Sequence, residues 1–234
     1  MLVHGACHGS WCWDRVVPLL EQSGYRVLTP DLPGRGNKGL PWWWRWTMSD
    51  YAREIVTAAR QAGGPVIAVG HSMGGQVISA AAEVAPELFE RLVYLTAFLP
   101  ADGDSIVSLA ALDKTSDIAK AARTSLLKGQ ITLDPEMAHP IFYGDCSADD
   151  FASIKPHLVA EPARPSFTKL HLTARFESVP RSYIRCAQDR AVSIELQDMM
   201  VAKQPCQHVA TLQASHSPFV SMPEQLVDTL RSII

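Results

Sequence analysis

Short apolar runs alternate with amphipathic segments along most of the chain. The apolar runs predict strands at residues 2–3, 25–29, 65–69, 91–96, 181–186 and 208–212. Helical patterns separate them, at residues 14–22, from Ser49 to the glycines at 63–64, at 74–85, and from a capping box that begins at Ser221. The alternation is typical of βαβ units, so it predicts an α/β fold with a mostly parallel central sheet flanked by helices.

Residues 102–179 break this alternation. They contain helical patches at 106–112 and 149–152, separated by five prolines. A structureless loop of this length is uncommon in a compact domain, so we expect a small helical insertion. The chain then divides into a core formed by residues 1–101 and 180–234, and a helical cap or lid formed by 102–179 over the carboxyl edge of the sheet.

Composition excludes several function classes. The 234 residues are 47% hydrophobic with a formal net charge of −3, and without a block of Lys or Arg we expect no nucleic-acid partner. No window approaches 18 uninterrupted apolar residues, and residues 1–9 lack the pattern of a signal peptide. The five cysteines are odd in number and form no CxxC pair, so we expect no metal site and no redox motif. Free thiols suit a reducing compartment, so we expect a cytoplasmic location. We also expect no cofactor.

A G-x-S-x-G motif spans residues 70–74, between a predicted strand and a predicted helix. The sharp turn that this context requires projects the serine hydroxyl outward, and its two glycines remove side chains that would clash. The helix that follows offers backbone N–H groups and the positive end of its dipole. We therefore predict that Ser72 is a catalytic nucleophile.

A nucleophilic serine needs a base and an acid that orients the base. Proteins with this motif carry them in the chain order serine, acid, histidine. Of the eight histidines, His216 lies directly after the last predicted strand and before the last helix, so it is the predicted base. Asp189 follows the strand that ends at residue 186 and is the predicted acid. Asp102 and Asp104, after an earlier strand, are the fallback.

An acyl-transfer serine also needs donors for the developing oxyanion. The backbone N–H of Met73, next to the nucleophile, is one predicted donor. The glycine-rich turn after the first strand, HGACHG at residues 4–9, supplies the other, and Ala6 N–H is the natural choice.

Five segments stand out as motifs of one known family: LVHGACHGSW at 2–11, DLPG at 31–34, GHSMGG at 70–75, YIRCAQDRA at 183–191 and ASHSP at 214–218. Together they resemble the plant methylesterase and hydroxynitrile lyase family of the α/β-hydrolase superfamily. The resemblance covers essentially the whole chain and implies an α/β-hydrolase fold. It also places a catalytic triad on Ser72, Asp189 and His216, in agreement with the residues chosen above.

The two branches of this family catalyse different reactions, ester hydrolysis in the esterases and cyanohydrin cleavage in the lyases. In the lyases that the chain resembles, a threonine precedes the oxyanion-loop residue and a lysine follows the catalytic histidine, where this sequence has Gly5 and Ser217. The resemblance therefore favours a bacterial-type esterase acting on a small-molecule ester. There are two alternatives: a lyase with the same triad, and a non-catalytic receptor on this scaffold. The sequence also leaves open whether the protein forms a homodimer.

Two features depart from the family pattern. Three residues precede His4, whereas a central strand usually needs about five, so either the strand is short or the natural start lies upstream. Four tryptophans gather at residues 42–46. We expect them to pack under the lid or to line the substrate pocket, which would suit a bulky hydrophobic or aromatic ester.

Overall fold

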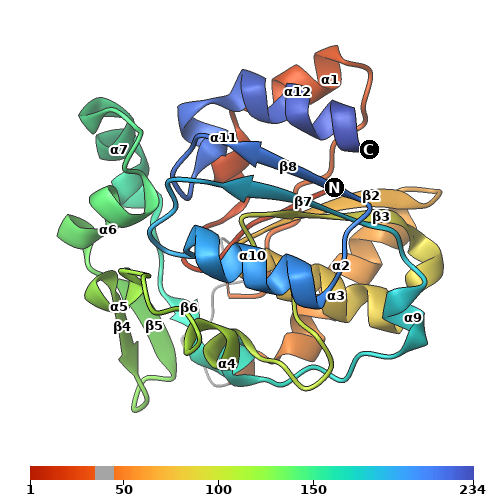
Figure 1. Cartoon of the computed structure of the whole chain (residues 1–234), viewed down its shortest axis with the longest axis horizontal. Coiled ribbons are helices and arrows are strands. Elements are labelled where there is room, and N and C mark those ends of the chain that lie inside the picture. Colours follow the sequence, from red (N-terminus) through yellow and green to blue (C-terminus); the bar gives the residue numbers. More distant parts are fainter. Residues whose placement is uncertain (35–44) are drawn as a thin grey trace.

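A five-stranded parallel sheet forms the centre of the computed structural model, which describes residues 1–34 and 45–234 (Figure 1). Its strands, in spatial order, are β1 (Leu2–Val3), β2 (Val66–His71), β3 (Phe89–Leu95), β7 (Arg181–Cys186) and β8 (His208–Leu212). Each neighbouring pair is parallel. The predicted α/β fold with a mostly parallel sheet is confirmed, and the predicted bounds of β1, β7 and β8 are met.

Helices cover both faces of the sheet (Figure 1). One face carries α2 (Met48–Gln61), α3 (Gly74–Val84) and α10 (Ile194–Lys203), and the other carries α1 (Val17–Gln22), α11 (Pro218–Ser221) and α12 (Pro223–Ile233). The short 3-10 helices η1 (Ser10–Trp13) and η4 (Pro86–Leu88) precede α1 and β3. Among the described residues, no helix is long and apolar enough to cross a membrane.

The sheet separates two hydrophobic cores. In β3, Leu92 and Tyr94 point into the core beneath α2 and α3, whereas Val93 and Leu95 point into the core beneath α12. Successive side chains of a strand face opposite sides of a sheet, so a strand buried on both faces is apolar throughout. This burial on both faces explains why apolar runs in the sequence predict central strands.

The strand predicted at residues 25–29 does not form. The segment lies beside β1 but is joined to it by a backbone hydrogen bond at one residue, where Leu2 N donates to Leu28 O at 2.8 Å. A two-residue strand that already pairs with β2 on its other side presents too few backbone groups to build a second ladder.

Two predicted helix caps are wrong. The capping box of α2 is formed by Thr47, not Ser49: Asp50 N donates to Thr47 Oγ1 at 3.2 Å, and Thr47 N donates to Asp50 Oδ2 at 2.9 Å. Ser221 ends α11 instead of capping α12, and its hydroxyl donates to Asp145 Oδ2 at 2.8 Å. Thr47 has the extended backbone of an N-cap residue, whereas Ser49 already lies inside α2 and Ser221 inside α11.

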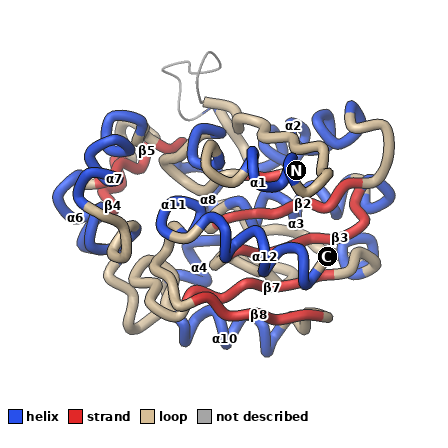
Figure 2. The backbone as a smooth tube through the Cα atoms, turned by 90° about the horizontal axis from the view of Figure 1, so that it is seen from above, coloured by secondary structure: helices blue, strands red, loops and turns tan. Residues whose placement is uncertain are grey.

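The insertion at residues 102–179 contains a small sheet as well as helices. Its elements are α4 (Ile106–Ala110), α5 (Ile118–Ala121), β4 (Ala122–Ser125), β5 (Gln130–Leu133), α6 (Pro135–Phe142), α7 (Ala148–Ile154), η5 (Lys155–His157), β6 (Glu161–Pro162), α8 (Ala163–Phe167) and α9 (Ala174–Glu177). The antiparallel sheet β4-β5-β6 was not predicted, because its strands are short and β4 and β5 are half-exposed. Figure 2 shows α6, α7, β4 and β5 gathered beyond one end of the central sheet.

The predicted tryptophan cluster falls largely outside the described residues, which exclude Trp42–Trp44. Trp46 is half-buried against the core beneath α2, and the Arg45 guanidinium lies 5.5 Å from the centre of its ring. The expectation that the cluster lines the pocket stays a prediction.

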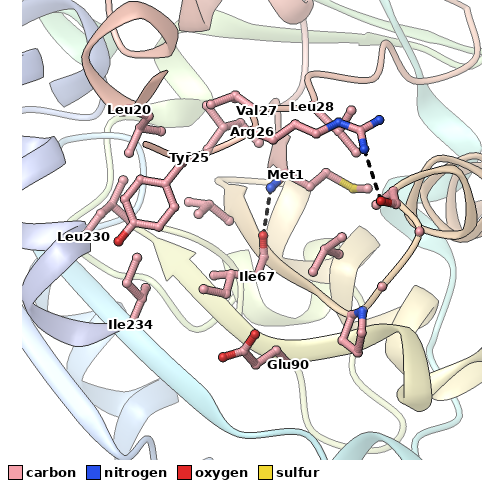
Figure 3. A pocket seen from close by; sticks show the side chains of 17 residues that line it. Met1, Leu20, Tyr25, Arg26, Val27, Leu28, Ile67, Glu90, Leu230 and Ile234 are labelled. Atoms are coloured by element: carbon pink, nitrogen blue, oxygen red, sulfur yellow. Dashed lines mark hydrogen bonds between the residues drawn. The ribbon is translucent and has the colours of Figure 1, made fainter. Parts of the chain in front are cut away.

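A cavity of about 660 Å³ opens at the amino ends of β1 and β2, around Met1 (Figure 3). Its apolar lining includes Leu20, Val27, Leu28, Leu230 and Ile234. The Met1 amine donates to Ile67 O there at 2.8 Å. Because Ser72 follows the opposite end of β2, this cavity is separate from the predicted site.

Candidate active site

Ser72 lies in the sharp turn between β2 and α3, with a φ of 54°. An L-residue pays about 1–2 kcal/mol to adopt this left-handed conformation, and such strain is found mostly at functional sites. The motif glycines make the turn feasible: a Cβ on Gly70 would lie 2.5 Å from Gly74 O, and one on Gly74 would lie 2.7 Å from Val3 O. The sequence therefore folds into the turn predicted for a nucleophile.

Backbone hydrogen bonds fix this turn against the neighbouring strand. Ser72 N donates to Leu95 O at 3.3 Å, and Phe98 N donates to Ser72 O at 3.1 Å. The serine side chain itself remains partly exposed. The strained residue is thus held by β3 while its hydroxyl stays accessible.

His216 and Asp189 form a buried hydrogen-bonded pair. His216 Nδ1 donates to Asp189 Oδ2 at 2.6 Å, and the exposed fractions of the two side chains are 1% and 0%. Asp189 Oδ1 accepts from the N–H groups of Ala191 at 2.6 Å and Val192 at 2.9 Å. These donors offset the cost of burying a carboxylate, and the pair leaves His216 Nε2 with a free lone pair, as a general base requires.

His71 links this pair to the serine turn. Its Nε2 donates to His216 O at 2.8 Å, and the centres of the two rings lie 4.6 Å apart. Among the described residues, no hydrogen bond joins Ser72 Oγ to His216 Nε2. Such contacts are often long without substrate and tighten in the Michaelis complex.

The glycine-rich turn approaches Ser72 closely. A Cβ on Gly5 would lie 2.9 Å from Ser72 Cβ, so the adjacent Ala6 lies beside the nucleophile. Within the described part of the chain, the N–H groups of Ala6 and Met73 donate to no protein acceptor. Both amides are therefore available to an oxyanion, and their catalytic role stays a prediction.

Two histidines brace this turn from within the protein. His4 Nδ1 donates to Gly5 O at 2.9 Å, and His8 Nδ1 donates to Ala6 O at 2.7 Å. Their other ring nitrogens accept from Leu32 N and from the Tyr143 hydroxyl. The carbonyls of the turn are thus occupied by buried imidazoles, which keeps the peptide planes in place.

The fallback acids are engaged elsewhere. Asp102 accepts from Leu172 N at 2.9 Å and from His171 on the surface. Asp104 accepts from Ala101 N and pairs with Lys203 at 3.0 Å. Of the acids considered from sequence, the structure brings Asp189 to the histidine.

Sequence reasoning missed Thr96, whose hydroxyl donates a short hydrogen bond to Asp189 Oδ2. This buried residue follows β3 and has a φ of 38°, which is a genuine outlier for a β-branched side chain. Its position at the end of the strand beside β7 was the available signal, because the carboxyl ends of parallel strands meet at one edge.

The insertion also contacts the site loops. The Tyr143 hydroxyl donates to His8 Nε2 at 2.5 Å, and Ser215 N donates to Asp145 Oδ2 at 3.0 Å. Asp145 further accepts from the hydroxyls of Ser215 and Ser221. One short segment of the insertion therefore holds both the glycine-rich turn and the loop that carries His216.

Replacing Thr96 tests its role in orienting Asp189. Thr96→Val keeps the branched shape but removes the donor, so we expect kcat/KM for an ester to fall by about 10- to 100-fold, the range for losing a hydrogen bond to a charged group. Thr96→Ser keeps the hydroxyl and is the matched control. Equal activity of the Val and Ser variants in steady-state assays would contradict this role.

The pH dependence of stability should report His71. Burial, reinforced by the nearby His216 and His8, lowers the pKa of His71 well below its usual 6.5. Below pH 6.5 the unfolded chain therefore binds a proton that the folded chain excludes, so stability falls as the pH falls. His71→Gln should reduce the slope of the unfolding free energy against pH by up to about 1.4 kcal/mol per unit.

Denaturant titrations between pH 7 and pH 5 measure this slope. Gln retains a donor for His216 O, so the variant removes the titration while keeping the contact. Identical slopes for the two proteins would rule out a neutral, buried His71.

Comparison with known proteins agrees with this geometry. Residues 1–229 match the model of the alpha/beta hydrolase family. The chain is 30% identical over 245 residues to the putative chloroplastic methylesterase 11 of Arabidopsis thaliana, covering 100% of this chain and 63% of that protein. It is 30% identical over 247 residues to a pyrethroid hydrolase of Sphingobium wenxiniae, covering 98% of this chain and 85% of that one.

A solved structure gives the same result. The crystal structure of a pyrethroid hydrolase from Sphingobium faniae JZ-2 superposes with a TM-score of 0.89 at 31% identity, covering 99% of this chain and 94% of that chain. The resemblance to methylesterases and the expected α/β-hydrolase fold are both confirmed. The chain belongs to the alpha/beta hydrolase family.

Proposed function

We propose that this protein hydrolyses hydrophobic or aromatic carboxylic esters through an acyl-enzyme on Ser72. The observation that carries the proposal is the buried hydrogen bond between His216 and Asp189, which lies against the strained turn of Ser72. A binding module has no need for a histidine oriented in this way beside a serine.

The reaction class follows from the family and from the activities for which the relatives are named. The methylesterases are esterases by name and the pyrethroid hydrolases are hydrolases by name, and the chain is a carboxylic ester hydrolase. The lyase alternative is less well supported. Gly5 leaves no space for the threonine of the lyase pattern, since a Cβ there would contact Ser72 Cβ at 2.9 Å, and the buried Ser217 carries no charge for cyanide.

Acylation begins when Ser72 Oγ attacks the ester carbonyl carbon and its proton passes to His216 Nε2. The N–H groups of Ala6 and Met73 stabilise the negative oxygen of the tetrahedral intermediate. His216 then donates the proton to the departing alkoxide, which leaves as an alcohol. Asp189 stays ionised and stabilises the imidazolium throughout.

Deacylation repeats these steps with water. His216 removes a proton from the water, the hydroxide attacks the acyl carbon, and the proton returns to Ser72 Oγ as the carboxylic acid leaves. His216 therefore mediates every proton transfer in both half-reactions.

Aromatic side chains around the site support a hydrophobic substrate. Phe142 of the insertion packs edge-on against His216, with ring centres 5.3 Å apart. Partly exposed Trp11 stacks on His8 at 5.4 Å and approaches His157 of the insertion at 5.6 Å. These rings suit an aryl or long alkyl ester, and the names of the pyrethroid hydrolases agree with that class.

Ser72→Ala tests the proposal directly. We expect hydrolysis of p-nitrophenyl esters to fall by at least about four orders of magnitude, because the nucleophile is lost while folding is retained. A fluorophosphonate should add once to the wild-type protein, on the peptide that contains Ser72, and should not add to the variant.

Ser153→Ala, at an exposed serine of α7, is the matched control and should keep full activity and labelling. Hydrolysis retained in Ser72→Ala would exclude the assigned nucleophile. Cyanide release from mandelonitrile without ester hydrolysis would favour the lyase, and ligand binding without turnover across an ester panel would favour the receptor.

A further inference from the structure

Glu161 is a fully buried carboxylate that the mechanism above does not use. It lies in β6 of the insertion, with 0% of its surface exposed. Its Oε2 accepts from Cys7 N at 3.0 Å, and its Oε1 accepts from the Tyr51 hydroxyl of α2 at 2.6 Å. Burying a carboxylate is costly unless its oxygens are bonded, so these contacts define where the side chain must lie.

The residue that Glu161 holds is strained. Cys7 has a φ of 63°, a conformation that an L-residue adopts only when its surroundings impose it. Its carbonyl accepts from Val159 N at 3.1 Å. Both backbone polar groups of Cys7 are therefore bonded to residues 159–161, and pairing of Glu161 with Ile131 ties this segment to β5.

Cys7 directly follows Ala6, whose N–H is the proposed oxyanion donor. The peptide between Ala6 and Cys7 is fixed at both ends, because His8 donates to its carbonyl and Glu161 accepts from its N–H. A trans peptide is planar, so two such contacts fix the plane. Without Glu161, this peptide loses one of the two contacts that fix its plane, so the strained turn can relax and shift Ala6 even though Val159 N still binds the Cys7 carbonyl.

We propose that Glu161 is a positioning residue that sets the oxyanion hole by fixing the peptide that follows Ala6. This inference rests on the proposed ester hydrolysis. It also gives the insertion a task in the site, since β6 supplies the acceptor for Cys7 N.

The test compares Glu161→Ala, Glu161→Asp and Glu161→Gln on a p-nitrophenyl ester. Ala and Asp cannot reach both donors, so we expect kcat to fall about 100-fold, the usual loss for one oxyanion donor, with KM changing less than about threefold. Gln can face its oxygen to Cys7 N and its amide to the Tyr51 hydroxyl, so kcat should return to within about tenfold of the wild type.

A tetrahedral inhibitor separates positioning from a general structural role. Affinity for an aryl trifluoromethyl ketone should fall in parallel with kcat/KM, whereas affinity for the product alcohol, which carries no acyl oxygen, should not change. Glu136→Ala, at an exposed acid of the same insertion, is the matched control and should match the wild type. If Glu161→Ala fails to fold, the Asp and Gln variants carry the comparison.

Unchanged kcat in the folded Ala or Asp variant, or a lower kcat with unchanged affinity for the ketone, would overturn the role of Glu161. These results are distinct from failure of the proposed function. That failure would appear as a wild-type protein that neither hydrolyses esters nor reacts with the fluorophosphonate at Ser72.

Discussion

The carboxylate of Asp189 accepts hydrogen bonds from four donors, and the rest of the site depends on it. The donors are the N–H groups of Ala191 and Val192, the Thr96 hydroxyl and the His216 ring. Asp189 follows β7, Thr96 follows β3 and His216 follows β8, so the buried charge joins the carboxyl ends of three adjacent strands. The same contacts that offset the desolvation of the buried carboxylate also orient the imidazole toward the serine turn.

The sequence predicted elements whose signal is local. Strand segments buried on both faces, such as residues 92–95 of β3, read as apolar runs because each successive side chain enters one of the two cores. The antiparallel sheet of the insertion gave no such signal, since its strands are short and half-exposed. The segment at 25–29 has strand composition but lacks a partner long enough to pair with, which no local pattern reveals.

In the candidate site, too, residues with a local sequence signal could be predicted and residues defined by distant contacts could not. The sequence motif and the positions after the strands predict Ser72, Asp189 and His216, and the structure joins the last two directly. Thr96 and Glu161 could not be selected, because a threonine at a strand end and a glutamate in an irregular segment are common. Their significance comes from the distant residues that they meet.

The contacts of the insertion with the site loops set an order of events during folding. Glu161 lies 154 residues from Cys7 along the chain, Tyr143 lies 135 from His8, and Asp145 lies 70 from Ser215. Contacts of such long range close large loops, and their entropy must be overcome before they add stability. Pairing of β3 with β7 in the central sheet joins residues 89 apart, such as Leu92 and Arg181. The contacts of the glycine-rich turn span longer loops, so the sheet can assemble before the turn at Cys7 is locked. Catalytic activity should thus be the last native property to return on refolding and the first to disappear when the insertion loosens.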